Sequence, residues 1–177
     1  ELVVAHNAGF DRIFIESRLP FFKEKAWACS YAQVPWRNVG FNAFNLEFLA
    51  YKFGFHFSGH RAAMDCHALL EILQSEWPTS EGMVFKSLLD MAYMQDLKIS
   101  ALNTPFESKD KLKGRGYRWD ADRKTWYTTV MESDLESEAN WLRQEVYDGR
   151  SFKLSQEVID AYNRFSNRRG ASEVVQY

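Results

Sequence analysis

Cysteine is scarce in this sequence, and its scarcity argues against two kinds of small protein. The 177 residues include two cysteines, Cys29 and Cys66, and neither belongs to a Cys-x-x-Cys pair. A disulfide framework needs several paired cysteines, and a structural zinc site needs closely spaced cysteine and histidine ligands. We therefore expect neither, and a reducing, cytoplasmic location fits the chain best.

Long apolar runs are missing as well. No stretch approaches the roughly 18 apolar residues that a membrane-spanning helix needs. The first residues also lack the basic, apolar and small-residue order of a secretory signal. We expect no membrane partner.

The chain has little net charge, which restricts how it could bind a polyanion. Its formal net charge is −2 at pH 7, so no overall attraction to nucleic acid is expected, and any such binding must come from local clusters of lysine and arginine. Apolar residues make up 46% and aromatic residues 16% of the chain, which is enough for a globular core.

The order of the predicted elements indicates a mixed α/β protein. We expect strands at 2–5 and 27–31, helices at 10–19, 46–53, 61–77, 82–96 and 109–115, a hairpin of strands at 117–119 and 125–130, and helices at 135–146 and 158–165. These elements predict a domain over residues 1–97, a small α/β basic-aromatic domain over 98–148, and a C-terminal helix and tail over 149–177.

The first candidate site residue is Asp11, in the segment His6-Asn7-Ala8-Gly9-Phe10-Asp11, where a strand passes into a helix. The helix dipole and the free backbone amides of a first turn favour a carboxylate there. On its own, such an aspartate is more often only a helix-start acid. His6, at the end of the strand, is more often a hydrogen-bonding structural residue than a catalyst.

The second cluster places His60 five residues before Asp65, at the start of a long predicted helix. Five helical steps of about 100° leave two side chains roughly 140° apart. Both can therefore face one site only if His60 lies outside the helix, which Gly59 permits. A carboxylate on a rigid helix suits metal binding, and a histidine on a loop can reach an attacking water.

Together the two clusters resemble the second and third motifs of the DnaQ-like, DEDDh family of 3′-to-5′ exonucleases in residue type, order and spacing. Residues 29–32 and 46–50 resemble the family segments between those motifs, and 108–119 resemble an extra C-terminal domain of one branch.

The resemblance implies an RNase H-like exonuclease core and hydrolysis of a 3′-terminal phosphodiester to nucleoside monophosphates. By that resemblance Asp11 and Asp65 would ligate two Mg²⁺ or Mn²⁺ ions, and His60 would be the general base. Asn7 can orient the loop or contact substrate. The expected partner is nucleic acid, with single-stranded 3′ ends of DNA favoured over RNA. A polymerase partner is not identified.

The family pattern also requires an Asp-x-Glu pair on an upstream strand. No acidic pair precedes Asp11, and Glu1 is alone and too close to the second motif to serve. The chain begins with Glu1, without an initiator Met, and passes directly into a predicted strand. We therefore expect a core truncated at its N-terminus, inactive or nearly so as it stands, and an active intact protein.

The predicted small domain mixes basic and aromatic residues, which are Lys111, Lys113, Arg115, Tyr117, Arg118, Trp119, Arg123, Lys124, Trp126 and Tyr127. Such a mixture can bind single strands, with cations on phosphates and rings stacked on bases. The aromatic residues can equally form the core of a small domain. Arg115, Arg118 and Lys124 are the better contact candidates.

Two alternatives to an exonuclease stay open. One is a non-catalytic nucleic-acid-binding or scaffolding protein that retains the fold, and the other is a protein-interaction module built on the aromatic hairpin.

Overall fold

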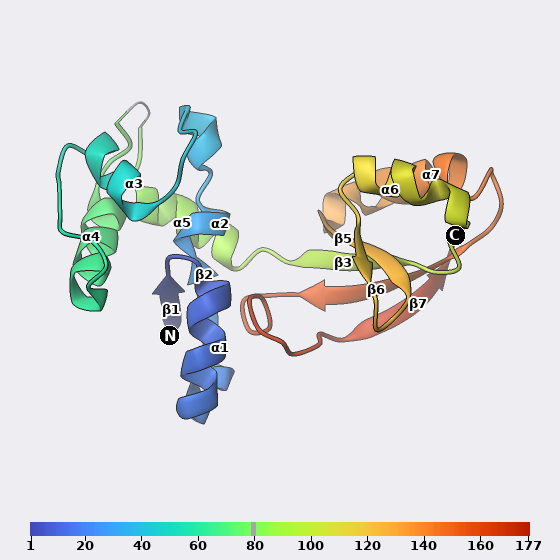
Figure 1. Ribbon diagram of the computed structural model, residues 1–177, viewed down its shortest axis with the longest axis horizontal. Helices are drawn as coiled ribbons and strands as arrows, with labels where there is room; N and C mark the ends of the chain where they lie inside the picture. Colours follow the sequence, from blue (N-terminus) through green and yellow to red (C-terminus); the bar gives the residue numbers. More distant parts are fainter. Residues whose placement is uncertain (79–80) are drawn as a thin grey trace. The chain divides into compact units, whose positions relative to one another are not determined.

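The computed structural model describes residues 1–78 and 81–177, and the chain divides into two compact units. The first unit comprises Glu1–Met94 and Arg164–Asn167, and the second comprises Gln95–Asn163 and Arg168–Tyr177. Figure 1 follows the chain through both units by colour. The mixed α/β class predicted from the sequence is confirmed.

The first unit contains two short parallel strands and several helices. In chain order they are β1 (Leu2–Ala5), α1 (Ala8–Arg18), the 3₁₀ helix η1 (Pro20–Glu24), β2 (Ala26–Cys29), α2 (Ser30–Gln33), the 3₁₀ helix η2 (Trp36–Val39), α3 (Leu46–Lys52), α4 (Ala62–Gln74) and α5 (Val84–Ala92). Strand β1 pairs with β2 from Leu2 opposite Ala26 to Ala5 opposite Cys29.

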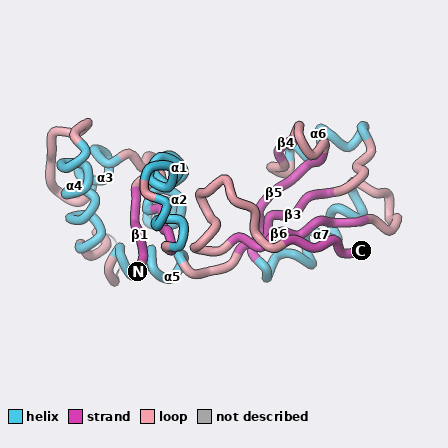
Figure 2. Tube along the Cα trace, turned by 90° about the horizontal axis from the view of Figure 1, so that it is seen from below, coloured by secondary structure: helices cyan, strands magenta, loops and turns pink. Residues whose placement is uncertain are grey.

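Both faces of this strand pair are covered, because neighbouring side chains in a strand point to opposite sides. Trp27 and Cys29 pack with Ala8 of α1. Ala28 points the other way, into a larger core that includes Ile72 of α4 and Leu88 of α5. Figure 2 shows β1 between α1 and α4.

Local sequence signals account for some boundaries of the first unit. Asn45 precedes the helix predicted at 46–53 and is a residue type that caps helices. It does so here, because its side chain accepts a hydrogen bond from the Phe48 amide at 2.8 Å. In the helix predicted at 61–77, the spacing of Ala62, Cys66, Leu69, Leu70 and Leu73 predicts the inner face, and this prediction is wrong in part. Cys66 and Leu70 are exposed, whereas Ala68 is buried, since the neighbouring helices cover a face rotated from the expected one.

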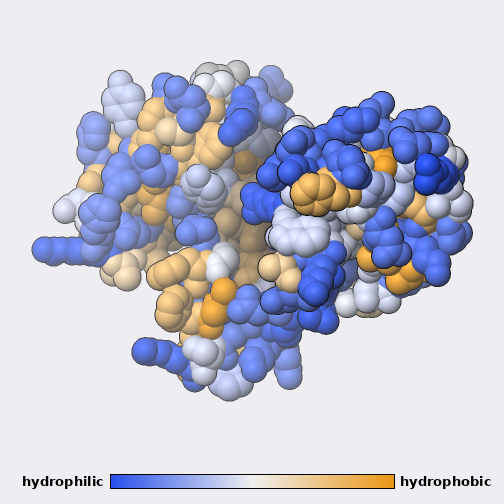
Figure 3. Space-filling model, turned by 45° about the vertical axis from the view of Figure 1, so that its right-hand side comes forward, coloured by the Kyte–Doolittle hydropathy of each residue, from blue (hydrophilic) through white to orange (hydrophobic). Residues whose placement is uncertain are grey.

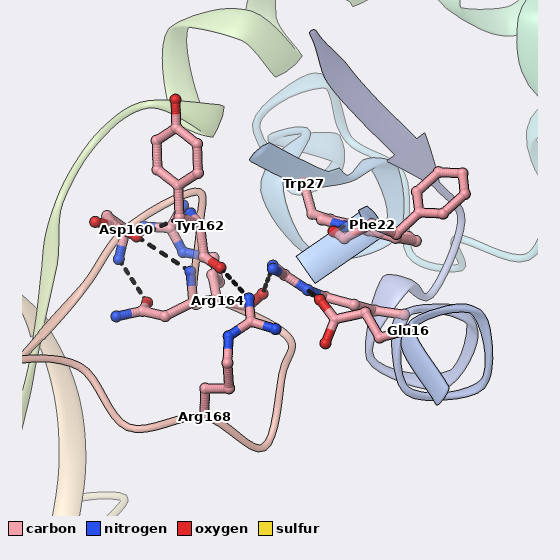
Figure 4. A network of polar contacts seen from close by, with 9 residues as sticks. Glu16, Phe22, Trp27, Asp160, Tyr162, Arg164 and Arg168 are labelled. Carbon is pink, nitrogen blue, oxygen red and sulfur yellow. Dashed lines mark hydrogen bonds and ion pairs between the residues drawn. The ribbon is translucent and has the colours of Figure 1, made fainter. Parts of the chain in front are cut away.

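The most unusual feature of this core is Arg12, whose side chain is fully buried. Its Nε donates to Glu16 Oε1 at 2.6 Å, and its Nη1 donates to the Arg164 carbonyl at 2.6 Å (Figure 4). Its guanidinium also lies 5.4 Å from the centroid of the Trp27 ring. A buried charge is tolerated only when it is hydrogen-bonded, so these contacts fix α1 against β2 and residues 164–167.

Replacing Arg12 with Leu is expected to lower the free energy of unfolding of the first unit by about 3 kcal/mol, because it removes one partner of a buried ion pair. Urea denaturation with hydrogen exchange would measure the loss. Arg18→Leu, at an exposed position of the same helix, is the control and should change stability by less than about 0.5 kcal/mol. Equal stability of the two variants would contradict this role.

The second unit is built on an antiparallel sheet of five strands in the order β4-β5-β3-β6-β7. Its elements are β3 (Asp96–Ala101), the 3₁₀ helix η3 (Phe106–Ser108), α6 (Lys109–Gly114), β4 (Arg118–Asp120), β5 (Thr125–Met131), the 3₁₀ helix η4 (Glu132–Asp134), α7 (Leu135–Glu145), β6 (Lys153–Ile159) and β7 (Ser172–Gln176).

Helices α6 and α7 cover one face of this sheet (Figure 1). Ile99 of β3 and Leu154 of β6 point to that face and are fully buried. They pack with Leu112 of α6 and Leu142 of α7. The sheet and the two helices therefore form the core of this unit.

The predicted C-terminal helix at 158–165 is wrong, and so is the prediction that 149–177 form a helix and tail. Residues Lys153–Ile159 and Ser172–Gln176 are strands that complete the sheet. Apolar residues near 158–165 have helix-like spacing, but Asp160 Oδ1 accepts the amides of Tyr162 and Asn163 and forms a turn. The central strand β3 was also missed, because residues 82–96 were assigned to one helix and the domain boundary was placed near 98.

In the described parts of the chain, no helix is long and apolar enough to cross a membrane.

Candidate functional site

The first unit has a cavity of about 360 Å³ that Asp11 and Asp65 both line. Asp11 comes from the first turn of α1 and Asp65 from the first turn of α4. The other lining residues are Val3, Val4, Ala5, His6, Ile15, Trp27, Leu46, Ala62, Cys66 and Leu69. The cavity therefore has two carboxylates in a largely apolar wall.

Helix periodicity explains why the two acids face inward. Residues three, four or seven positions apart lie on one face of a helix. Asp11 shares a face with Ala8 and Ile15, and Asp65 shares one with the buried Ala68 and Ile72. Both acids are half-buried and lie in the first turn of their helices, on the inward-facing stripe.

A second cavity of about 450 Å³ adjoins the first and contains His60 and Asn7. It is lined by His6, Asn7, Tyr31, Asn45, Leu46, Glu47, His60 and Asp65. His6, Leu46 and Asp65 line both cavities. The structure thus brings Asp11, Asp65, His60 and Asn7 around two adjoining cavities, and their catalytic roles stay predictions.

His60 and Asp65 can face one site only if His60 lies outside the helix, and the structure meets this condition. Helix α4 begins at Ala62 after Arg61, so His60 lies outside it. His60 has φ 65° and Asn7 has φ 75°, both in the left-handed region that few non-glycine residues adopt. Such conformations cost free energy and concentrate at functional sites.

Glu47 lies beside His60 and was absent from the site predicted from sequence. Its Oε1 is 3.9 Å from His60 Nε2. A Cβ added at Gly59 would come within 2.5 Å of the same oxygen, so the small size of glycine lets this loop pass the carboxylate. The sequence signal for Glu47 is an acid in the first turn of a helix. Such acids are common because they interact favourably with the helix dipole, so this position alone does not indicate a site.

His6 has the hydrogen bonds of a structural residue. Its Nε2 donates to the Phe44 carbonyl at 2.7 Å, and its Nδ1 lies 2.9 Å from Ser30 Oγ, from which it can accept. Burial lowers the pKa of His6 below its usual value of 6.5, partly offset by the bond to Phe44. The imidazole is therefore held in its neutral form and links β1 to α2 and the loop before α3.

We expect an NMR titration of His6 to show a midpoint below 6.5. Because the folded-state pKa is depressed, the unfolded chain takes up this proton first as pH falls. The stability from neutral His6 should be complete above about pH 7.5 and decrease as pH falls through 6.5 and below the folded pKa. His6→Gln should weaken this pH dependence, and a midpoint at or above 6.5 would contradict the assignment.

The donor atoms of Asp11 and Asp65 suit Mg²⁺ or Mn²⁺, which prefer carboxylate oxygens. Their number does not suffice, because within residues 1–78 and 81–177 no three histidine, cysteine, aspartate or glutamate side chains form a group placed to hold a metal ion. The two acids fit the predicted ions in kind and need further ligands.

In the second unit, the predicted contact residue Arg115 is already engaged by an acid. It donates to Glu138 Oε2 through Nε at 3.2 Å and Nη2 at 2.9 Å, and lies 4.9 Å over the Trp141 ring. Tyr117 Oη donates to Glu138 Oε1 at 3.0 Å. Burial, and then the Glu138 charge, raises the pKa of Tyr117, so its hydroxyl remains a donor.

The other two predicted contact residues lie apart from this network. Arg118 is exposed on β4 and lines a small pocket with Tyr127, on strand β5. Lys124 is the last residue of the turn between β4 and β5 and lines a larger pocket with Trp119 and Trp126. The three residues therefore do not form one contact surface.

Replacing Glu138 with Gln is expected to destabilise the second unit by about 2 kcal/mol, because hydrogen bonds to a charged acceptor contribute about 1.5–3 kcal/mol. Thermal and urea denaturation would measure the change. Glu136→Gln is the control, because Glu136 lies two residues earlier in α7 and is exposed. Unchanged stability of Glu138→Gln would show that the network is dispensable.

One family model matches the chain, over residues 100–143, and its description is a domain of unknown function, DUF5710. The matched residues lie within the second unit and make up about a quarter of the chain. No curated protein and no solved structure matches the chain.

Proposed function

We propose that the first unit belongs to a metal-dependent 3′-to-5′ exonuclease of the DnaQ-like type, with an RNase H-like core. The observation that carries this proposal is the position of Asp65, which lines one cavity with Asp11 and the adjoining cavity with His60. Three residues separated by up to 54 positions in the chain thus line two adjoining cavities that share Asp65. The direction of digestion rests on the motif resemblance.

Each residue has a distinct role in the proposed site. Asp11 and Asp65 would hold Mg²⁺ or Mn²⁺, together with carboxylates that the motif resemblance places upstream. When bound, such ions activate water and stabilise charge on the attacking and leaving oxygens. His60 would take the proton from the attacking water, since its side chain is exposed at the cavity and free of a helix.

The supporting residues favour this division of roles. The half-buried acids are on the ends of packed helices, which keep their positions fixed. His60 is on a loop, with Glu47 beside it at 3.9 Å, where the carboxylate can orient the imidazole and stabilise it once it has gained a proton. Glu47 would therefore be a positioning residue.

A non-catalytic nucleic-acid-binding role is the second candidate. One observation favours it, namely that the described residues contain no group of three possible metal ligands. The two candidates differ in whether the folded, full-length protein hydrolyses a phosphodiester.

The test is a nuclease assay of the full-length protein with Mn²⁺ on 5′-labelled single-stranded DNA. We expect a product ladder that shortens from the 3′ end. Asp65→Asn and His60→Ala should each reduce the rate roughly 100-fold or more, because general-base catalysis alone contributes about 10²–10⁴-fold. Asp65→Asn should also weaken Mn²⁺ binding measured by electron paramagnetic resonance, and His60→Ala should not.

Matched controls are available on α4 itself. Glu71→Gln and His67→Ala remove the same chemical groups at exposed positions, and neither residue lines the cavities. Both should keep the wild-type rate. Wild-type rates in Asp65→Asn and His60→Ala would refute the site, and a folded full-length protein without nuclease activity would favour the non-catalytic role.

A further inference from the structure

The second unit contains a pocket of about 480 Å³ whose walls combine lysines with aromatic rings. It is lined by Asn103, Thr104, Pro105, Phe106, Lys109, Lys113, Trp119, Lys124 and Trp126. No carboxylate is among these residues. The volume lies within the range of about 300–1,000 Å³ that is usual for small-molecule sites.

The lysines converge because of local geometry. Lys109 and Lys113 are four residues apart on α6 and so share one face of the helix. Lys124 is in the turn between β4 and β5, has φ 51°, and lines the same pocket. Three cationic groups from two elements thus face one space.

The aromatic residues divide into a buried floor and exposed walls. Trp126 is 9% exposed and belongs to the core. Its cross-strand partner Trp119 is 49% exposed, with ring centroids 5.4 Å apart. Phe106 is 76% exposed, and the Lys109 ammonium lies 4.4 Å from its ring centroid.

The exposure of the aromatic rings distinguishes the two interpretations of these residues, as a core or as a binding site for single strands. Tyr117 and Trp126 belong to the core, as the structural interpretation expected. Trp119 and Phe106 keep large ring surfaces in solvent beside a pocket. Figure 3 shows hydrophilic side chains over most of the visible face of this unit, interrupted by small hydrophobic areas. The core does not use these two exposed ring faces, which leaves them open to a ligand of the pocket.

The lysines of the pocket differ from three neighbouring basic residues, because those three form ion pairs and the pocket lysines form none with a described carboxylate. Lys111 binds Glu145 at 3.0 Å, Arg115 binds Glu138 at 2.9 Å, and Arg123 binds Glu157 at 3.4 Å. Lys109, Lys113 and Lys124 have no ion pair within 4.0 Å with any carboxylate in the described parts of the chain. Three cations of the pocket are thus not neutralised by a carboxylate of the described residues.

We propose that this pocket binds a nucleotide within a single-stranded nucleic acid. The base would stack on Trp119 and Phe106, and the flanking phosphates would contact Lys109, Lys113 and Lys124. Bases within a duplex are stacked on each other and cannot offer a free face, so the pocket selects single strands. The site is independent of the proposed nuclease residues, and it replaces Arg115 with Lys109 and Lys113 as contact residues.

The test is fluorescence anisotropy of a labelled ten-nucleotide thymidine strand with the full chain at near-physiological salt. Trp119→Ala is expected to weaken binding by about 5-fold to 100-fold, since stacking contributes about 1–3 kcal/mol per base. Lys109→Gln with Lys113→Gln should weaken binding and reduce the dependence of log affinity on log salt by one to two units. Circular dichroism and melting curves would show that the variants are folded.

The helix supplies its own control. Lys111→Gln removes the same charge from α6, but Lys111 lies outside the pocket and is paired with Glu145, so wild-type affinity is expected. Because this assay measures binding and the nuclease assay measures hydrolysis, the failure of one proposal leaves the other standing.

Further ligands identify what the pocket recognises. A uridine strand competing as well as the thymidine strand would show that the sugar is not read, and competition by thymidine monophosphate would place the recognition in one nucleotide. Equal binding of duplex DNA or heparin, or wild-type affinity in both the Trp119 and the double lysine variants, would overturn the proposal.

Discussion

The first unit depends on the fully buried guanidinium of Arg12. A charge removed from water is stable only when its hydrogen-bonding groups are occupied, and Arg12 meets this condition through Glu16 and the Arg164 carbonyl. These directional contacts set the rotation of α1 about its own axis. Asp11 is the preceding residue, about 100° around the helix, and the same rotation places it at the cavity.

The cavity lies beside the first turns of α1 and α4. Below Asp65, Ala68 and Ile72 are buried in the core, and below Asp11 lies Ile15. In the first turn of each helix an acid occupies a position on the packed face. Each carboxylate is therefore held by the packing of the helix behind it, while its oxygens remain at the cavity.

In the second unit, three lysines lie around one pocket without an ion pair to a described carboxylate. Acids of this unit compensate some of its basic side chains, as Glu138 does for Arg115 and Glu157 does for Arg123. These pairs hold helices and turns against the sheet. The lysines of the pocket have no such role, which leaves their charge available to a ligand.

The sequence alone determined the elements that depend on neighbouring residues. The Asn45 cap, the aromatic hairpin of β4 and β5, and the position of His60 outside α4 all follow from local rules, and the structure has them. Only the tertiary structure decided which strands complete the sheet, because β3 pairs with β5 and β6, and segments of such separation carry no local signal for their partners. It also decided that Arg115 is bound by Glu138 while Lys109 and Lys113 line a pocket, since the partners of a charged side chain depend on residues brought close by folding.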